Sequence, residues 1–131
     1  MKRSLQITML VVAAIPLMLG LLGFILGAGQ FVPKDQITAN LDSHIRFSAI
    51  WFTGAFFLTV WCVRNLEIAG PVMRILFVVM AFGGAARLFS MSQFGIPDPP
   101  MIGGAIVEIA VLAFIPWHAV VMRHTQTETP T

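Results

Sequence analysis

Three charged residues lie within apolar segments of this sequence: Arg46, Arg87 and Glu108. An ionised side chain at the centre of a membrane span costs roughly 2.5–3.5 kcal/mol on insertion scales, so such residues face a protein interior or a cavity and usually have a charged partner. A guanidinium group can hold a carboxylate or a phosphate through two parallel hydrogen bonds. The trio therefore has the chemistry of an internal ion pair or of an anion clamp.

The positions of the three residues predict a common depth. Arg46 is expected about four residues after the start of its helix, Arg87 about seven residues before the end of the next, and Glu108 about seven residues into the last. At 1.5 Å of rise per helical residue, all three lie roughly 6–10 Å below the same boundary of the membrane. Asp42 precedes Arg46 by four residues and shares its helix face. His44 and Ser90 are further polar residues close to this depth. Together with Asp42, they form a candidate second tier at the mouth of the site.

Small residues precede two of the charged positions by one helical turn. They are Gly83 and Gly84 before Arg87, and Gly103, Gly104 and Ala105 before Glu108. Small residues allow helices to approach closely in a membrane. We therefore expect Arg87 and Glu108 to meet across a contact between their two helices.

Three interpretations fit the trio. In the first, an ion pair fixes the helix register, with Glu108 paired to one arginine while the other extends toward the surface. In the second, two guanidinium groups against one carboxylate leave a positive charge. That charge favours an anionic head such as a carboxylate, a phosphate or a lipid headgroup. The third is a proton or ion relay, a role that ionisable residues in membranes often serve.

The elements that must position these residues are membrane spans. Of the 131 residues, 57% are hydrophobic and only 11% are charged, whereas soluble domains carry about 25% charged residues. A span needs about 20 mostly apolar residues, and four stretches qualify: 5–28, 44–63, 71–94 and 101–122. We predict an all-α four-helix transmembrane bundle forming a single domain over residues 1–124, followed by a polar, disordered tail at 125–131.

The connections between the spans support this division. Residues 95–100, Gly-Ile-Pro-Asp-Pro-Pro, cannot continue a helix and predict a rigid turn. Pro71 suits the first turn of the third helix, where its missing N–H is not needed. These short connections predict that the second, third and fourth helices are antiparallel neighbours. In the longer connection before them, Asp42 or Ser43 is placed to cap the second helix.

The distribution of basic residues predicts the orientation in the membrane. With the N-terminus inside, the inner side holds Lys2, Arg3, Arg64, Arg74 and Arg123, and the outer side holds Lys34. Both termini are therefore expected in the cytoplasm. The first stretch also has the basic start of a signal peptide, but its apolar run exceeds the roughly 7–15 residues of a signal core. We favour a retained helix.

Other chemistry has little support in the sequence. Cys62 is the single cysteine, which excludes an internal disulfide and a thiolate metal cluster. A bis-histidine haem needs two histidines at one depth, but His44 is expected at the opposite end of the spans from His118 and His124. The basic residues are scattered, unlike a nucleic-acid surface. We expect no cofactor, no nucleic-acid partner and, on balance, no enzymatic activity.

A metal ion held by Asp42, His44 and Glu108 is a lesser alternative. Their spacing matches none of the compact metal-binding motifs. We therefore predict no metal site.

Two arginine-containing runs give the chain a family likeness. Residues 40–47, Asn-Leu-Asp-Ser-His-Ile-Arg-Phe, open the second span, and residues 83–90, Gly-Gly-Ala-Ala-Arg-Leu-Phe-Ser, lie in the third, with Glu108 in the fourth. From 40 to 122 the chain resembles a family of small bacterial four-span membrane proteins of undefined function, similar to the broader DoxX-like group. The resemblance implies a membrane bundle in the bacterial inner membrane and offers no catalytic residues to transfer.

These observations lead to one functional prediction and two alternatives. We expect a membrane protein that binds a small amphipathic or anionic ligand, or a membrane lipid, at Arg46, Arg87 and Glu108. The first alternative is a structural or accessory subunit of a larger membrane complex, in which every charge of the trio is paired internally. The second follows from the association of some DoxX-like proteins with quinone-linked sulfur oxidation, and it is a quinone-linked redox component. A homo-oligomer or a partner membrane subunit is compatible with each.

Overall fold

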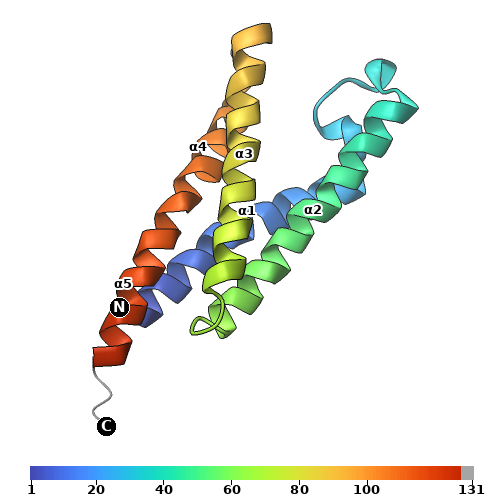
Figure 1. Ribbon diagram of the computed structural model, residues 1–131. Coiled ribbons are helices and arrows are strands. Elements are labelled where there is room, and N and C mark those ends of the chain that lie inside the picture. The colour runs from blue at the N-terminus through green and yellow to red at the C-terminus, as the bar shows by residue number, and fades with distance from the viewer. Residues whose placement is uncertain (128–131) are drawn as a thin grey trace. The chain divides into compact units, whose positions relative to one another are not determined.

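The computed structural model describes residues 1–127, and all regular elements in that range are helical (Figure 1). The α-helices are α1 (Lys2–Leu26), α2 (Ala39–Arg64), α3 (Gly70–Phe94), α4 (Pro99–Ala110) and α5 (Phe114–Thr127). Short 3-10 helices are η1 (Gly27–Gln30), η2 (Lys34–Gln36) and η3 (Val111–Ala113). The absence of strands from residues 1–127 confirms the all-α class. Most of the tail predicted to be disordered, residues 128–131, lies outside the described residues.

The chain divides into two compact units, each described by itself. The first hairpin is Gln6–Arg64 and contains most of α1, together with η1, η2 and α2. The second hairpin comprises the residues from Asn65 onward together with Met1–Leu5, and contains α3, α4, η3 and α5. The single four-helix bundle stays a prediction.

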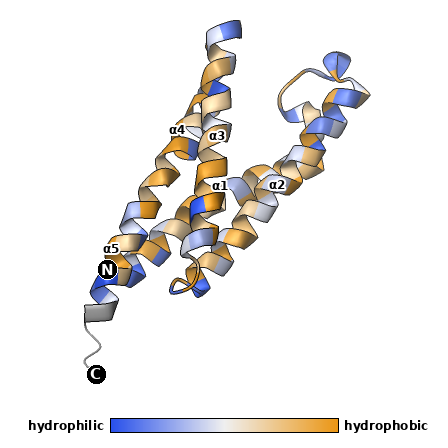
Figure 2. Ribbon diagram, viewed as in Figure 1, coloured by the Kyte–Doolittle hydropathy of each residue, from blue (hydrophilic) through white to orange (hydrophobic). Residues whose placement is uncertain are grey.

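Four helical segments in the described residues are long and apolar enough to cross a membrane: Lys2–Gln30, Ala39–Arg64, Gly70–Phe94 and Pro99–Thr125. Figure 2 shows that apolar residues cover these helices, while polar residues gather toward helix ends and around the connection between α1 and α2. Large side chains such as Trp51, Ile75 and Phe82 are exposed. Exposed apolar surface on this scale is unfavourable in water and suits lipid.

The two helices of the first hairpin run antiparallel and touch through small residues. A Cβ atom at Gly20 would lie 2.8 Å from the Ala49 carbonyl oxygen, and one at Gly23 would lie 2.9 Å from the Ala49 Cβ. Closer to the ends of the helices, the Gln6 side chain donates a hydrogen bond to the Val63 carbonyl oxygen at 2.9 Å. Glycine is therefore required where α1 crosses α2.

Helix α2 begins at Ala39, five residues before the predicted span. Thr38 caps the helix, because its Oγ1 accepts a hydrogen bond from the Leu41 N–H at 3.2 Å. The prediction that Asp42 or Ser43 caps this helix is wrong. Both residues lie inside the helix, and the Asp42 carboxylate is used elsewhere.

The second hairpin turns sharply between α3 and α4. Gly95 has a φ of +91°, which favours glycine, and its N–H donates to the Met91 carbonyl oxygen at 3.0 Å to end α3. Pro99 then opens α4, two residues before the predicted start of the fourth span. The short turn makes α3 and α4 antiparallel neighbours, as Figure 1 shows.

The fourth span, predicted as one helix, is interrupted. Helix α4 tightens into η3 over Val111–Ala113 before α5 begins. Pro116 explains the change, because it has no N–H to donate to the Leu112 carbonyl and its ring crowds that oxygen. Beyond the break, the buried His118 anchors α5 to the loop before α3. Its Nε2 lies 2.7 Å from the Leu66 carbonyl oxygen, to which it donates.

Candidate functional site

Arg87 of α3 and Glu108 of α4 form a two-pronged ion pair within the second hairpin. Arg87 Nε lies 2.9 Å from Glu108 Oε2, and Nη2 lies 3.2 Å from Oε1. The side chain of Glu108 is 12% exposed and that of Arg87 is 31% exposed. This arrangement, with two parallel hydrogen bonds, fixes the orientation of the two side chains as well as pairing their charges. It confirms the predicted contact between the two residues.

Glycine residues allow the two helices to come close enough for this pair. A Cβ atom at Gly84 would lie 2.8 Å from Ile109 Cγ1 and 2.9 Å from the Ala105 carbonyl oxygen. On the opposite helix, Gly104 faces the guanidinium, since a Cβ there would lie 3.9 Å from Arg87 Cζ. The prediction that small residues bring α3 and α4 together is confirmed for Gly84 and Ala105. Gly103 has no atom within 4 Å of its Cβ position and does not take part.

The guanidinium of Arg87 retains hydrogen-bonding capacity. Of its five N–H groups, two bind Glu108 and one, on Nη1, donates to the Met101 Sδ at 3.5 Å. A thioether is a weak acceptor. The other two N–H groups have no partner among residues 1–127. Because Met101 lies in the first turn of α4, Nη1 is directed toward the turn between α3 and α4.

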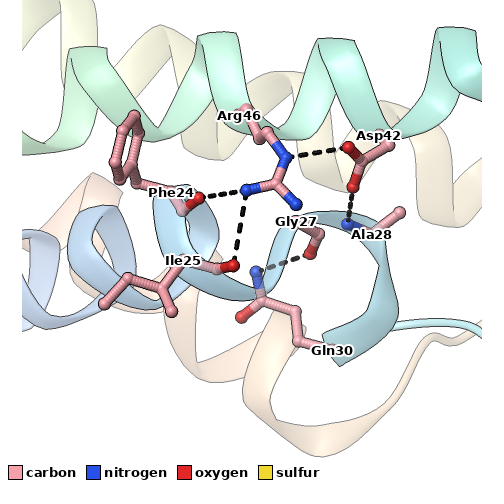
Figure 3. A network of polar contacts seen from close by, with 7 residues as sticks. All are labelled: Phe24, Ile25, Gly27, Ala28, Gln30, Asp42 and Arg46. Atoms are coloured by element: carbon pink, nitrogen blue, oxygen red, sulfur yellow. Dashed lines mark hydrogen bonds and ion pairs between the residues drawn. The ribbon is translucent and has the colours of Figure 1, made fainter.

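The second pair of opposite charges lies in the first hairpin, on one helix. Arg46 Nε lies 2.8 Å from Asp42 Oδ2 at i,i+4 spacing along α2. Arg46 Nη1 also donates to the backbone carbonyl oxygens of Phe24 and Ile25. Figure 3 shows the guanidinium turned from α2 toward the last turn of α1.

This pair completes the end of α1. The last four carbonyl groups of a helix lack partners within it, and Arg46 supplies donors for two such groups. Asp42 Oδ1 accepts the Ala28 N–H at 2.9 Å, just beyond Gly27, whose φ of +58° turns the chain into η1 (Figure 3). One Asp–Arg pair therefore satisfies both the carbonyl groups and the first N–H at this turn.

The charge balance differs from the sequence prediction. Two arginines against one glutamate implied a positive charge, but Asp42 neutralises Arg46 and Glu108 neutralises Arg87, each within its own hairpin. The i,i+4 spacing of Asp42 and Arg46 was the signal for this pairing. His44 and Ser90, assigned to the second tier, are both exposed, and their part in ligand binding stays a prediction. In the described part of the chain, no group of three His, Cys, Asp or Glu residues lies together that could hold a metal ion.

The four helical segments, long and apolar enough to cross a membrane, indicate a multi-pass membrane protein. The chain belongs to the family described as Domain of unknown function (DUF4345), whose model matches residues 4–118. No curated protein and no solved structure matches the chain significantly.

Proposed function

We propose that this protein binds a small amphipathic or anionic molecule, or a lipid, at the Arg87–Glu108 pair of the second hairpin. The observation that carries the proposal is the incomplete pairing of the Arg87 guanidinium. Two of its N–H groups have no partner in residues 1–127, and a third has only a thioether. In the hydrocarbon region an unsatisfied polar group costs several kcal/mol, so an acceptor from outside the chain is strongly favoured.

The proposed roles follow from the geometry. Glu108 holds the guanidinium in one orientation, and the guanidinium presents its remaining N–H groups to the head of the bound molecule. Exposed apolar side chains of α3, such as Phe82 and Leu88, are available to its tail. Arg46 and Asp42, which the sequence predicts at the same site, have backbone partners at the end of α1 and serve the fold in this proposal.

The proposal places the protein in the bacterial inner membrane with both termini in the cytoplasm. The excess of Lys and Arg on the predicted inner side supports this orientation. The bacterial location and the DoxX-like grouping rest on the resemblance of the runs at 40–47 and 83–90.

The test is to identify what the purified protein retains. The parent protein is compared with the double variant Arg87→Gln/Glu108→Gln, which keeps a neutral side-chain pair between α3 and α4. The exposed pair Lys2–Glu67 supplies the matched control, Lys2→Gln/Glu67→Gln. Bound molecules are extracted and identified by mass spectrometry. The proposal expects one species to be retained by the parent and the control and lost from the Arg87/Glu108 variant; equal retention by all three contradicts it.

A second candidate, a structural or accessory subunit of a larger membrane complex, has one observation in its favour. Both arginines have a carboxylate partner within their own hairpin, as a purely structural role requires. This candidate expects the Arg87/Glu108 double variant to lose stability without losing any bound species. The quinone-linked redox alternative rests on the DoxX-like resemblance alone.

A further inference from the structure

We infer that the group recognised by Arg87 is an uncharged carbonyl oxygen, that of the ester linkage of a diacyl lipid, and that the lipid headgroup does not decide binding. This inference rests on the proposed function and narrows it. It follows from the charge balance of the pair, from the direction of Arg87 Nη1, from the position of Arg87 along α3, and from the glycines beside the pair.

The first step is electrostatic. The Arg87 guanidinium already has a carboxylate at 2.9 and 3.2 Å, so the pair carries no net charge. A phosphate or carboxylate bound to the remaining N–H groups would leave a negative charge in a region of low dielectric constant. Burial of a charge without a partner is far more costly than burial of a hydrogen-bonded neutral group. A carbonyl oxygen accepts the same N–H groups without adding charge.

The second step concerns depth. Arg87 lies seven residues before the end of α3 at Phe94, which corresponds to about 10 Å of helix rise. Its Nη1 is directed to Met101, in the first turn of α4, and so toward the α3–α4 turn. In a diacyl lipid the ester carbonyls lie closest to the acyl chains, whereas the phosphate lies further out. With the end of α3 at the membrane boundary, Arg87 lies about 10 Å inside it, on the apolar side of the interface, where the ester is the nearest acceptor.

The third step concerns the shape of the helix surface beside the pair. Gly83 and Gly104 border the carboxylate and the guanidinium, and neither adds a side chain over them. Gly103 has nothing within 4 Å of its Cβ position. The edge of the ion pair is therefore accessible to a lipid whose acyl chain lies along the hairpin and whose ester carbonyl oxygen lies at the level of Arg87.

The experiment compares lipids that differ in one group. The parent protein in detergent is mixed with a diacyl phosphatidylcholine, its dialkyl ether analogue with the same headgroup, or a diacyl phosphatidylglycerol with the same acyl chains. Lipid retention is measured by native mass spectrometry. We expect the ester lipids to be retained about tenfold more strongly than the ether lipid, the effect of one hydrogen bond from a charged donor, and the two ester headgroups to behave alike.

The variants separate this inference from the proposed function. In the Arg87→Gln/Glu108→Gln variant the preference for ester over ether is expected to disappear, while the Lys2→Gln/Glu67→Gln control keeps it. If phosphatidylglycerol is preferred and ester and ether lipids bind equally, the site binds an anion; the inference is then overturned while the proposed function stands. If no retention depends on Arg87, both are overturned. The comparison of ester with ether lipid needs only the parent protein, so a variant that fails to fold does not remove the test.

Discussion

Each of the two hairpins has one arginine paired with a carboxylate near its turn, but the two pairs form different structures. In the first hairpin, Arg46 and Asp42 lie on one helix, and both reach the backbone at the end of α1. In the second, Arg87 and Glu108 lie on different helices, and their hydrogen bonds within residues 1–127 go to side chains. The first pair completes a helix terminus. The second joins two helices and leaves two N–H groups of Arg87 without a partner among residues 1–127.

The two ion pairs also differ in how far their side chains are buried. The side chains of Arg46 and Asp42 are 43% and 30% exposed, against 31% and 12% for Arg87 and Glu108. Removing one partner of a buried pair leaves an uncompensated charge and costs much more than removing one from an exposed pair. The comparison therefore teaches that stability depends on the second pair more than on the first, although the second is also the candidate for binding.

The largest expected effect is that of Glu108→Gln. The substitution leaves the Arg87 guanidinium without its carboxylate, and we expect a loss of about 3 kcal/mol, at the low end for a buried pair because Arg87 is partly exposed. Thermal unfolding in detergent, followed by circular dichroism, measures it. Glu67→Gln removes a carboxylate from a more exposed pair and should cost below about 1 kcal/mol. An unchanged or raised melting temperature for Glu108→Gln would mean that Glu108 is held at a cost to stability, as functional residues often are.

The second prediction concerns the glycine that allows this pair. In Gly84→Ala the new Cβ meets the Ala105 carbonyl oxygen at 2.9 Å and Ile109 Cγ1 at 2.8 Å, so α4 must move away from α3. We expect a loss of about 1–3 kcal/mol. Gly103→Ala lies on the same hairpin with open space around the new atom and should change stability by less than about 1 kcal/mol, in the stabilising direction. Equal effects at the two positions would refute the close contact.

The sequence predicted the helices and one of the two pairs, for identifiable reasons. Long apolar runs specify membrane helices directly, and the small residues before Arg87 and Glu108 indicated their contact. The sequence does not predict hydrogen bonds between a side chain and the backbone of a segment far away in the chain. Nothing local to Arg46 indicates that the carbonyl groups of Phe24 and Ile25 need donors. The sequence signal for η3 is Pro116, which interrupts the predicted fourth span.

The third prediction tests the first hairpin with the corresponding change, Asp42→Asn. The amide oxygen can still accept the Ala28 N–H, and Arg46 keeps its bonds to the α1 carbonyl groups. The Arg46 Nε–H loses its acceptor, because an amide NH2 replaces Asp42 Oδ2. We therefore expect a drop in melting temperature clearly smaller than that of Glu108→Gln under the same conditions. A drop as large as that of Glu108→Gln would show that charge, and not completion of the helix end, is what the first pair contributes.

The smallest expected effect concerns the first turn of α2, on which Asp42 is carried. Thr38→Ala removes the oxygen that accepts the Leu41 N–H, and loss of such a cap typically costs about 1 kcal/mol. Ser43→Ala is the matched control, because Ser43 was the alternative cap in the sequence reading and is exposed within the helix. Hydrogen exchange at Leu41 should rise in Thr38→Ala and stay unchanged in Ser43→Ala. Faster exchange in Ser43→Ala and unchanged exchange in Thr38→Ala would show that α2 begins at Ser43. Asp42 would then lie outside the helix that positions it against α1.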